Sequence, residues 1–242
     1  MGGDELQSAA EFEQKASFLE GMQGGVSIAV GYMPVALAFG LIAKSTGLVL
    51  GEAVMMSLLV FAGAAQYISL TLIAAGTGAF EIVFTTFIMN IRHFLMAASL
   101  NERAEEEAPW KKALYAFGIT DETFSVASLK EGRLSSGYMY GLIAVSFSSW
   151  VIFTGIGHWA GNLLPVLVQE SMSIALYALF IGLLVPSLKG HRKVMVLAAS
   201  AAVINTLLIV SGFFSAGWAI VIATVISAAG VELLWKESRN HG

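Results

Sequence analysis

The feature that most constrains this chain is a succession of apolar segments of nearly membrane-spanning length. A transmembrane helix needs about 20 predominantly apolar residues. Only 12% of the 242 residues are charged, which is about half the share that a soluble domain carries. The sequence therefore predicts an all-α integral membrane protein, a polytopic helical bundle of about seven to eight spans with broken or re-entrant helices. The apolar segments lie at about 24–43, 52–76, 80–100, 113–129, 138–163, 172–188, 194–213 and 217–234.

Several other classes of protein are disfavoured. The short alternating segments of a membrane β-barrel are not seen. The chain has no cysteine, so disulfides and cysteine-based metal or redox chemistry are excluded. No basic cluster suggests nucleic acid, and no motif for covalent chemistry, phosphate binding or a metal site is present. We therefore expect no enzyme activity, no cofactor and no metal.

The charged residues divide the chain into three parts. Residues 1–22 form a polar N-terminal tail that could fold as an amphipathic helix at the membrane interface. Residues 23–235 form a single transmembrane domain, and residues 236–242 form a C-terminal tail. The N-terminal tail lacks the basic start that is typical of a cleaved signal peptide.

Lysine and arginine predict the orientation of the bundle, because cytoplasmic loops carry an excess of both. Cations flank the loops at 130–133 and 189–193 and the C-terminus, whereas the loops at 164–171 and 213–216 have none. This pattern predicts a multi-pass protein of the cytoplasmic (inner) membrane with a cytoplasmic C-terminus. It leaves the side of the N-terminus open.

The segment 113–129 is apolar at both ends and acidic in the middle. Cationic loops lie on both sides of it, which favours a segment that dips into the membrane and returns, although a crossing segment remains an alternative. Gly118 would be the break. Thr120 would cap the second half-helix, with Asp121 and Glu122 in its first turn.

Two further motifs interrupt apolar segments. In "GYMPVALAFG", Gly31 and Pro34 predict a helix break that exposes backbone groups to substrate, with a simple kink as the alternative. In "FAGAAQYIS", Gln66 offers an amide that could bind substrate or, equally, hold two helices together.

The stretch "NIRHFLMAA" places Arg92 near the middle of a span. A charge there costs about 2.5–3.5 kcal/mol on insertion scales and needs a partner. Asp121 and Glu122 are the scarce acids at membrane depth, so a pair with one of them is predicted. The pair is either static or exchangeable for substrate. His93, on one face with Asn90, could carry a proton.

Taken together, these motifs resemble the AzlC/YgaZ family, the large subunits of branched-chain amino acid exporters. The resemblance rests on four stretches in order and spacing: Gly31-Tyr-x-Pro34 with Ala38-Phe39-Gly40, Phe61 to Gln66, Asn90-Ile-Arg92-His93, and Ala116 to Glu122. It implies export of valine, leucine, isoleucine and sometimes methionine, with a small hydrophobic AzlD/YgaH-type membrane subunit as partner.

An amino acid zwitterion needs a cation, an anion and an apolar pocket. We therefore expect substrate to meet Pro34, Gln66, Asn90, Arg92, Asp121 and Glu122, and we expect an ion gradient, most simply of protons, to act through His93, Asp121 or Glu122. The alternatives are a non-transporting assembly subunit and an intramembrane enzyme.

Overall fold

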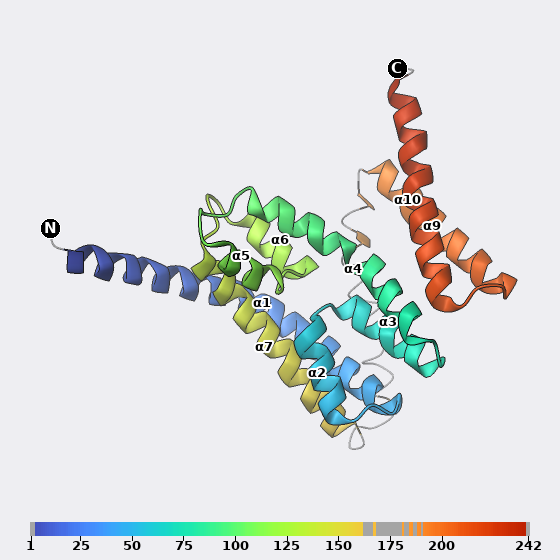
Figure 1. Cartoon of the computed structure of the whole chain (residues 1–242), viewed down its shortest axis with the longest axis horizontal. Coiled ribbons are helices and arrows are strands. Elements are labelled where there is room, and N and C mark those ends of the chain that lie inside the picture. Colours follow the sequence, from blue (N-terminus) through green and yellow to red (C-terminus); the bar gives the residue numbers. More distant parts are fainter. Residues whose placement is uncertain are drawn as a thin grey trace. The chain divides into compact units, whose positions relative to one another are not determined.

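The computed structural model describes residues 3–161 and 191–240, together with residues 167, 181, 184, 185, 188 and 189. The described chain forms helices and turns, apart from one isolated bridge between Ala104 and Leu134. The helices are α1 Gly3–Ser45, α2 Leu50–Val60, α3 Gly63–Ala74, α4 Ala79–Asn101, α5 Pro109–Ala116, α6 Asp121–Leu129, α7 Ser136–Ala160, α9 Arg192–Ser211 and α10 Ala216–Asn240 (Figure 1). The predicted span 172–188 lies largely outside the described residues.

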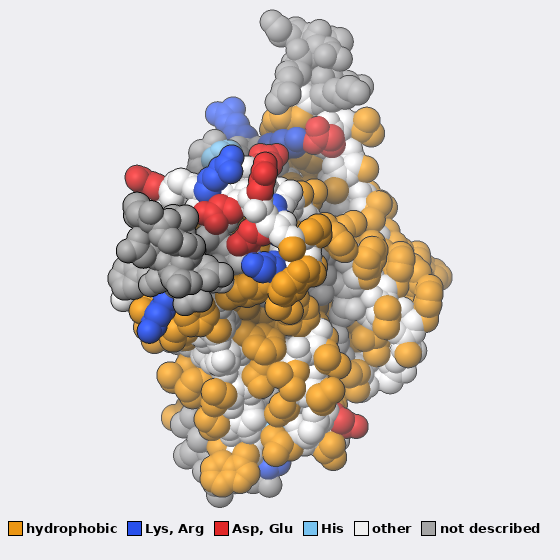
Figure 2. Space-filling model, turned by 60° about the vertical axis from the view of Figure 1, so that its left-hand side comes forward, with side chains coloured by type: hydrophobic (Ala, Val, Ile, Leu, Met, Phe, Trp, Pro, Cys, Tyr) orange, Lys and Arg blue, Asp and Glu red, His pale blue; other side chains and the backbone are white. Residues whose placement is uncertain are grey.

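The chain divides into two compact units, described separately below. Unit 1 contains residues 1–66 and 90–173, and unit 2 contains residues 67–89 and 174–242. Among the described residues, five helices are long and apolar enough to cross a membrane: Gln14–Ser45, Ala79–Asn101, Ser136–Ala160, Arg192–Ser211 and Ala216–Trp235. Hydrophobic side chains are widespread on the face drawn in Figure 2. The predicted polytopic helical membrane protein is confirmed.

The first helix, α1, corrects one prediction. It runs from Gly3 to Ser45 without interruption, so the break expected at Gly31 and Pro34 is wrong. A proline removes a single backbone hydrogen bond. Because α1 packs along α7 both before and after Pro34, tertiary contacts hold the helix together across it. The polar segment 1–22 is helical from Gly3 and continues directly into the span.

Helices α1 and α7 form the centre of unit 1 and run parallel to each other, side by side in Figure 1. A Cβ on Gly21 would lie 2.0 Å from the carbonyl oxygen of Tyr138, and one on Gly40 would lie 2.1 Å from that of Thr154. Residue numbers thus increase together along the two helices. Only glycine allows backbones to approach this closely, which is how helices pack without a hydrophobic driving force in lipid.

The predicted span 52–76 is also corrected, because it is two short helices rather than one. α2 ends at Val60, its C-cap Phe61 is left-handed with φ 40° and ψ 45°, and α3 begins at Gly63. Phe61 is the only residue besides glycine with a positive φ in the part of the chain that is described. Such a conformation costs a non-glycine residue roughly 1–2 kcal/mol. Gly63 lies at this break in the sequence, but an isolated glycine in an apolar segment does not by itself predict a helix end.

The segment 113–129 breaks as predicted, into α5 and α6 separated by residues 117–120. Its two ends lie together. The Leu134 amide donates to the Arg103 carbonyl at 2.8 Å, and the Glu105 amide donates to the Leu134 carbonyl at 3.0 Å. The Arg103 guanidinium also donates to the backbone carbonyls of Ser128, Lys130 and Gly132. The residues that flank the segment therefore lie side by side, which supports the predicted dip into the membrane over a crossing segment.

Unit 2 contains the start of α4 and the helices α9 and α10. The turn from Gly212, at φ 70°, to Ser215 is short, so α9 and α10 form a helical hairpin. The Glu81 carboxylate accepts hydrogen bonds from the Ser215 hydroxyl and the Trp218 amide and so caps α10. The rings of Phe84 and Trp218 lie 5.6 Å apart.

Candidate functional site

The candidate site is the tip of the α5–α6 hairpin in unit 1. Gly118 permits this position, because a Cβ there would lie 2.2 Å from Cγ2 of Ile143 on α7. α6 begins directly afterwards because Thr120 is its N-cap, as predicted. The Thr120 hydroxyl accepts from the Thr123 amide at 3.2 Å, and the Thr123 hydroxyl accepts from the Thr120 amide at 2.7 Å and donates to the Gly118 carbonyl at 3.0 Å. The break thus satisfies its own backbone groups, as a break inside a membrane must.

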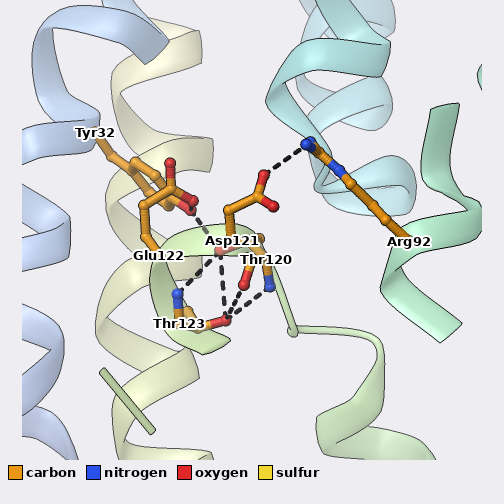
Figure 3. A network of polar contacts seen from close by, with 6 residues as sticks. All are labelled: Tyr32, Arg92, Thr120, Asp121, Glu122 and Thr123. Atoms are coloured by element: carbon orange, nitrogen blue, oxygen red, sulfur yellow. Dashed lines mark hydrogen bonds and ion pairs between the residues drawn. The ribbon is translucent and has the colours of Figure 1, made fainter. Parts of the chain in front are cut away.

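Tyr32, near the middle of α1, reaches this tip through its hydroxyl group (Figure 3). The hydroxyl donates to Oε2 of Glu122 at 2.6 Å and lies 2.7 Å from the hydroxyl oxygen of Thr120. Its single proton goes to Glu122, so the Thr120 hydroxyl is the donor in the second bond. Only 4% of Tyr32 is exposed. The tyrosine therefore fixes both the cap and the second acid of α6.

Arg92, on α4, reaches the same tip from another direction (Figure 3). Nη2 of Arg92 lies 2.8 Å from Oδ2 of Asp121, which confirms the predicted ion pair and selects Asp121 over Glu122 as its partner. The exposed fractions of the two side chains are 45% and 27%. Both groups are therefore reachable, and neither is locked inside the protein.

The first turn of α6 thus carries two carboxylates with different partners. Asp121 faces a guanidinium, and Glu122 faces a phenol hydroxyl. Both carboxylates also lie at a helix N-terminus, where the helix dipole favours negative charge. A cation, two anions and the start of a helix meet within one cluster, which we call the tip cluster: Tyr32, Arg92, Thr120, Asp121, Glu122 and Thr123.

Tyr32 was not among the site residues predicted from the sequence. The available signal was its place in "GYMP", inside an apolar span, because a buried tyrosine hydroxyl usually needs a partner. Its ring also contacts the other broken segment. The ring centroid lies 6.2 Å from that of Phe61 and 5.1 Å from that of Trp150, and the Phe61 ring lies 4.9 Å from that of Phe147.

Gln66 belongs to a separate buried network. It is fully buried, its Nε2 donates to the Ser57 hydroxyl at 3.1 Å, and its Oε1 accepts from Nε1 of Trp150 at 3.0 Å. The Ser57 hydroxyl lies 2.8 Å from that of Thr154. This network links α2, α3 and α7. It favours the interhelical role of Gln66, and its contact with substrate stays a prediction.

The other predicted site residues lie outside the tip cluster. Asn90 and His93 are partly exposed on α4, and neither side chain has a hydrogen-bond partner among the described residues. Pro34 is exposed on α1. Their roles stay predictions. Among the described residues, no group of three or more His, Asp or Glu side chains could hold a metal ion.

A shallow cavity of about 210 Å³ lies between α4 and α5, beside the hairpin tip. Its Ala97 and Asn101 follow His93 at intervals of four residues on α4, so they lie on the same helix face. Small and apolar side chains form most of its wall, and the amine of Lys112 donates to Oδ1 of Asn101 at 3.2 Å. The lining residues are Ala97, Asn101, Lys112, Ala113, Tyr115, Ala116 and Ile119.

Comparison with known proteins places the chain in a family. Residues 27–164 match the family model described as AzlC protein. The chain is 36% identical over 193 residues to the inner membrane protein YgaZ of Escherichia coli (strain K12), covering 76% of this chain and 78% of that protein. It is 32% identical over 181 residues to an uncharacterized membrane protein of Archaeoglobus fulgidus, covering 74% and 80%.

A more distant relative carries a functional name. The chain is 23% identical over 182 residues to the branched-chain amino acid transport protein AzlC of Bacillus subtilis (strain 168), covering 74% of this chain and 70% of that protein. No solved structure matches the chain. The matched region contains the whole tip cluster, and this multi-pass membrane protein belongs to the AzlC family.

Proposed function

We propose that this chain is the large subunit of a secondary transporter that exports branched-chain amino acids: valine, leucine and isoleucine, with methionine as a further candidate. The observation that carries the proposal is the ion pair between Arg92, in the middle of a span, and Asp121, at the start of a broken helix. Ionisable groups at this depth are expensive and usually serve transport. The name of the Bacillus subtilis relative supports the same substrate class.

The tip cluster suits the two charges of an amino acid zwitterion. The substrate carboxylate replaces Asp121 at the guanidinium of Arg92, which can bind a carboxylate through two parallel hydrogen bonds. The substrate ammonium then neutralises the Asp121 carboxylate, with Glu122 as a second acceptor nearby. The exchange leaves no charge without a partner, so it removes most of the cost of separating the resident pair.

The aliphatic side chain of the substrate needs an apolar pocket. The cavity between α4 and α5 supports this role, because alanines and Ile119 contribute most of its lining and its volume is about 210 Å³. Shape and apolar contact alone would distinguish aliphatic side chains only weakly, since one methylene contributes about 1–3 kcal/mol to discrimination. We therefore expect one transporter to accept several branched-chain amino acids.

The sequence carries no nucleotide-binding motif, so we propose an ion gradient, most simply of protons, as the energy source. His93 lies one residue after Arg92, and Glu122 is held by Tyr32. Either group, or Asp121, can take up the coupling proton when substrate disturbs the cluster. We also propose that the chain acts with a small hydrophobic AzlD/YgaH-type subunit in the inner membrane, has a cytoplasmic C-terminus and is not an enzyme.

Counterflow of labelled amino acids into vesicles that contain the chain and its small partner tests this function. We expect labelled leucine and valine to accumulate in vesicles preloaded with unlabelled leucine, and labelled lysine not to accumulate. Arg92→Lys keeps the charge but loses the planar geometry that fits a carboxylate, so it should lose most counterflow while folding normally.

Arg133→Lys is the matched control, because Arg133 is exposed in the loop before α7 and lies outside the tip cluster. It should transport at the wild-type rate. If Arg92→Lys also transports at the wild-type rate, the arginine is a structural charge and the substrate carboxylate binds elsewhere. Absence of counterflow for every branched-chain amino acid, with both subunits present in the vesicles, would contradict the substrate class itself.

A further inference from the structure

The two helix breaks at Phe61 and Thr120, both in unit 1, contact one side chain, that of Tyr32. We propose that α2–α3 and α5–α6 are re-entrant hairpins that enter the membrane from opposite faces, and that Tyr32 closes the space between their tips.

The α5–α6 hairpin enters from the cytoplasmic face. Its two ends are joined by the Ala104–Leu134 bridge and by the Arg103 guanidinium. Five cations lie at these ends: Arg103, Lys111, Lys112, Lys130 and Arg133. An excess of lysine and arginine marks the cytoplasmic side. The start of α7, directly after Arg133, is on that side as well.

The direction of α1 follows from that of α7. The two helices run parallel, as the close approaches at Gly21 and Gly40 require. The Lys15 end of α1 is therefore cytoplasmic, and the chain leaves α1 at Ser45 on the opposite face. Lys44 is the single cation at that end. The side of the N-terminus, which the cations alone left open, is thus cytoplasmic.

The direction of α4 shows on which face of the membrane the chain leaves α3. The end of α4 at Asn101 leads within three residues to the Ala104–Leu134 bridge, so it is cytoplasmic. α4 has 23 residues and is long and apolar enough to cross the membrane, so its start at Ala79 is on the opposite face. The chain between Ser45 and Ala79 thus begins and ends on that face. Helices of 11 and 12 residues reach about half of a 30 Å core at 1.5 Å per residue.

Tyr32 contacts both tips at once. Its ring packs edge-on against Phe61 at the break of α2–α3, and its hydroxyl bonds to Thr120 and Glu122 at the break of α5–α6. If the proposed transport function holds, a substrate that enters from either face of the membrane reaches Tyr32. Substrate can pass this residue only when the tip of one hairpin moves away from it.

Labelling of single cysteines tests the topology without any transport measurement. The native chain has no cysteine, so each introduced thiol is unambiguous. We expect a membrane-impermeant maleimide to label Ser45→Cys and Ala75→Cys in intact cells. It should label Lys15→Cys, Glu106→Cys and Glu131→Cys only in inside-out vesicles. All five positions are exposed.

Two results would overturn the topology. Labelling of Ser45→Cys and Ala75→Cys from opposite faces would make α2–α3 a crossing segment. Labelling of Glu106→Cys and Glu131→Cys from opposite faces would make α5–α6 a crossing segment. Neither result depends on substrate, so the topology and the transport proposal can fail separately.

A cysteine at Ala62, which is 4% exposed beside the break, tests the closure by Tyr32. In the wild-type background Ala62→Cys should label slowly from the outer face. Adding Tyr32→Ala should raise the labelling rate severalfold, and Tyr32→Phe, which keeps the ring, should leave it unchanged. Tyr32→Leu serves the same purpose if Tyr32→Ala does not yield folded protein. Equal labelling rates in the wild-type, Phe and small-residue backgrounds would refute the closure.

Discussion

In the α2–α3 segment the helix breaks at a buried phenylalanine, whereas in the α5–α6 segment it breaks at a capped threonine. Phe61 is 2% exposed, and its ring packs against two other aromatic rings. Thr120 instead begins a set of hydrogen bonds that includes Thr123, Tyr32 and Glu122. One break is held by packing around a strained backbone, and the other by polar groups that satisfy it.

The difference separates a break held by apolar packing from one that carries ionisable side chains. Irregular backbone survives at membrane depth only where protein or a water-filled cavity surrounds it. The Phe61 break is buried among aromatic side chains and carries no charge. The Thr120 break carries two carboxylates and faces a partly exposed arginine. We therefore expect changes at Phe61 to act mainly on stability and changes at the tip cluster to act on transport as well.

The largest effect is expected at Phe61. Phe61→Ala should lower the free energy of unfolding by about 3–5 kcal/mol, because a buried aromatic ring is lost. The loss in Phe61→Gly should be about 1 kcal/mol smaller than the loss in Phe61→Ala, because glycine adopts the left-handed conformation without a Cβ clash. Titration of the purified protein with SDS in mixed micelles measures both values.

Phe39, a fully buried residue inside α1, is the matched control for that order. There glycine should be worse than alanine by about 1 kcal/mol, as in any helix interior. The order at Phe61 should thus be the reverse of the order at Phe39. The same order at both positions would mean that the left-handed backbone at Phe61 carries no strain.

The second effect concerns the charges of the tip cluster. Arg92→Ala strands the carboxylate of Asp121. Breaking a fully buried ion pair costs about 3–5 kcal/mol, and the partial exposure of both side chains lowers the expected loss to roughly 2 kcal/mol. Adding Asp121→Asn should restore the expression level and the thermal stability in detergent, because no charge is then left without a partner. It should not restore counterflow.

This pair of variants separates stability from transport. Full counterflow in the double variant would mean that neither charge binds substrate. Failure of Asp121→Asn to recover the stability lost in Arg92→Ala would mean that the ion pair is not what holds Arg92 in the membrane.

A smaller effect is expected where the α5–α6 hairpin meets α7. The Cβ of Gly118→Ala would lie 2.2 Å from Ile143, so the tip must shift or the isoleucine must move. Overpacking of this kind costs about 1–3 kcal/mol. Ile143→Ala added to Gly118→Ala should recover much of the loss, which the midpoint of thermal unfolding in detergent would show.

Gly31→Ala is the control for Gly118, because nothing lies within 4 Å of a Cβ at Gly31. Since α1 is continuous there, alanine should keep or raise stability by up to about 1 kcal/mol through its helix propensity. Strong destabilisation by Gly31→Ala would indicate that α1 does not stay helical at Gly31 in the membrane.

The smallest effect is expected at the cap of α6. Thr120→Val removes the hydroxyl that accepts from the Thr123 amide, which should cost about 1 kcal/mol. Thr120→Ser should keep the cap and most of the stability. Thr71→Val is the counterpart in α3. There the hydroxyl donates only to the Tyr67 carbonyl, four residues back in the same helix, and a change within about 0.5 kcal/mol is expected. Equal losses from Thr120→Val and Thr71→Val in SDS titration would argue against the cap.

The sequence by itself determined the features that lipid enforces residue by residue. Apolar length predicts the long helices, because a chain in hydrocarbon must satisfy its backbone hydrogen bonds within each helix. A pair of Arg92 with Asp121 or Glu122 was predictable for a similar reason, since a charge at this depth needs an opposite charge and few acids were available; the structure selects Asp121. The break at Gly118 was marked by a glycine, a capping threonine and cationic flanks.

The tertiary structure decided what depends on distant partners. Pro34 stays inside a helix because α7 supports α1 on both sides of it, and a helix breaks at Phe61, a residue type that rarely adopts the left-handed conformation. Tyr32 became part of the site only because α6 lies opposite α1. The backbone preference of a single residue amounts to about 1–3 kcal/mol. The packing of several side chains at each of these positions stabilises the observed conformation by more than that preference.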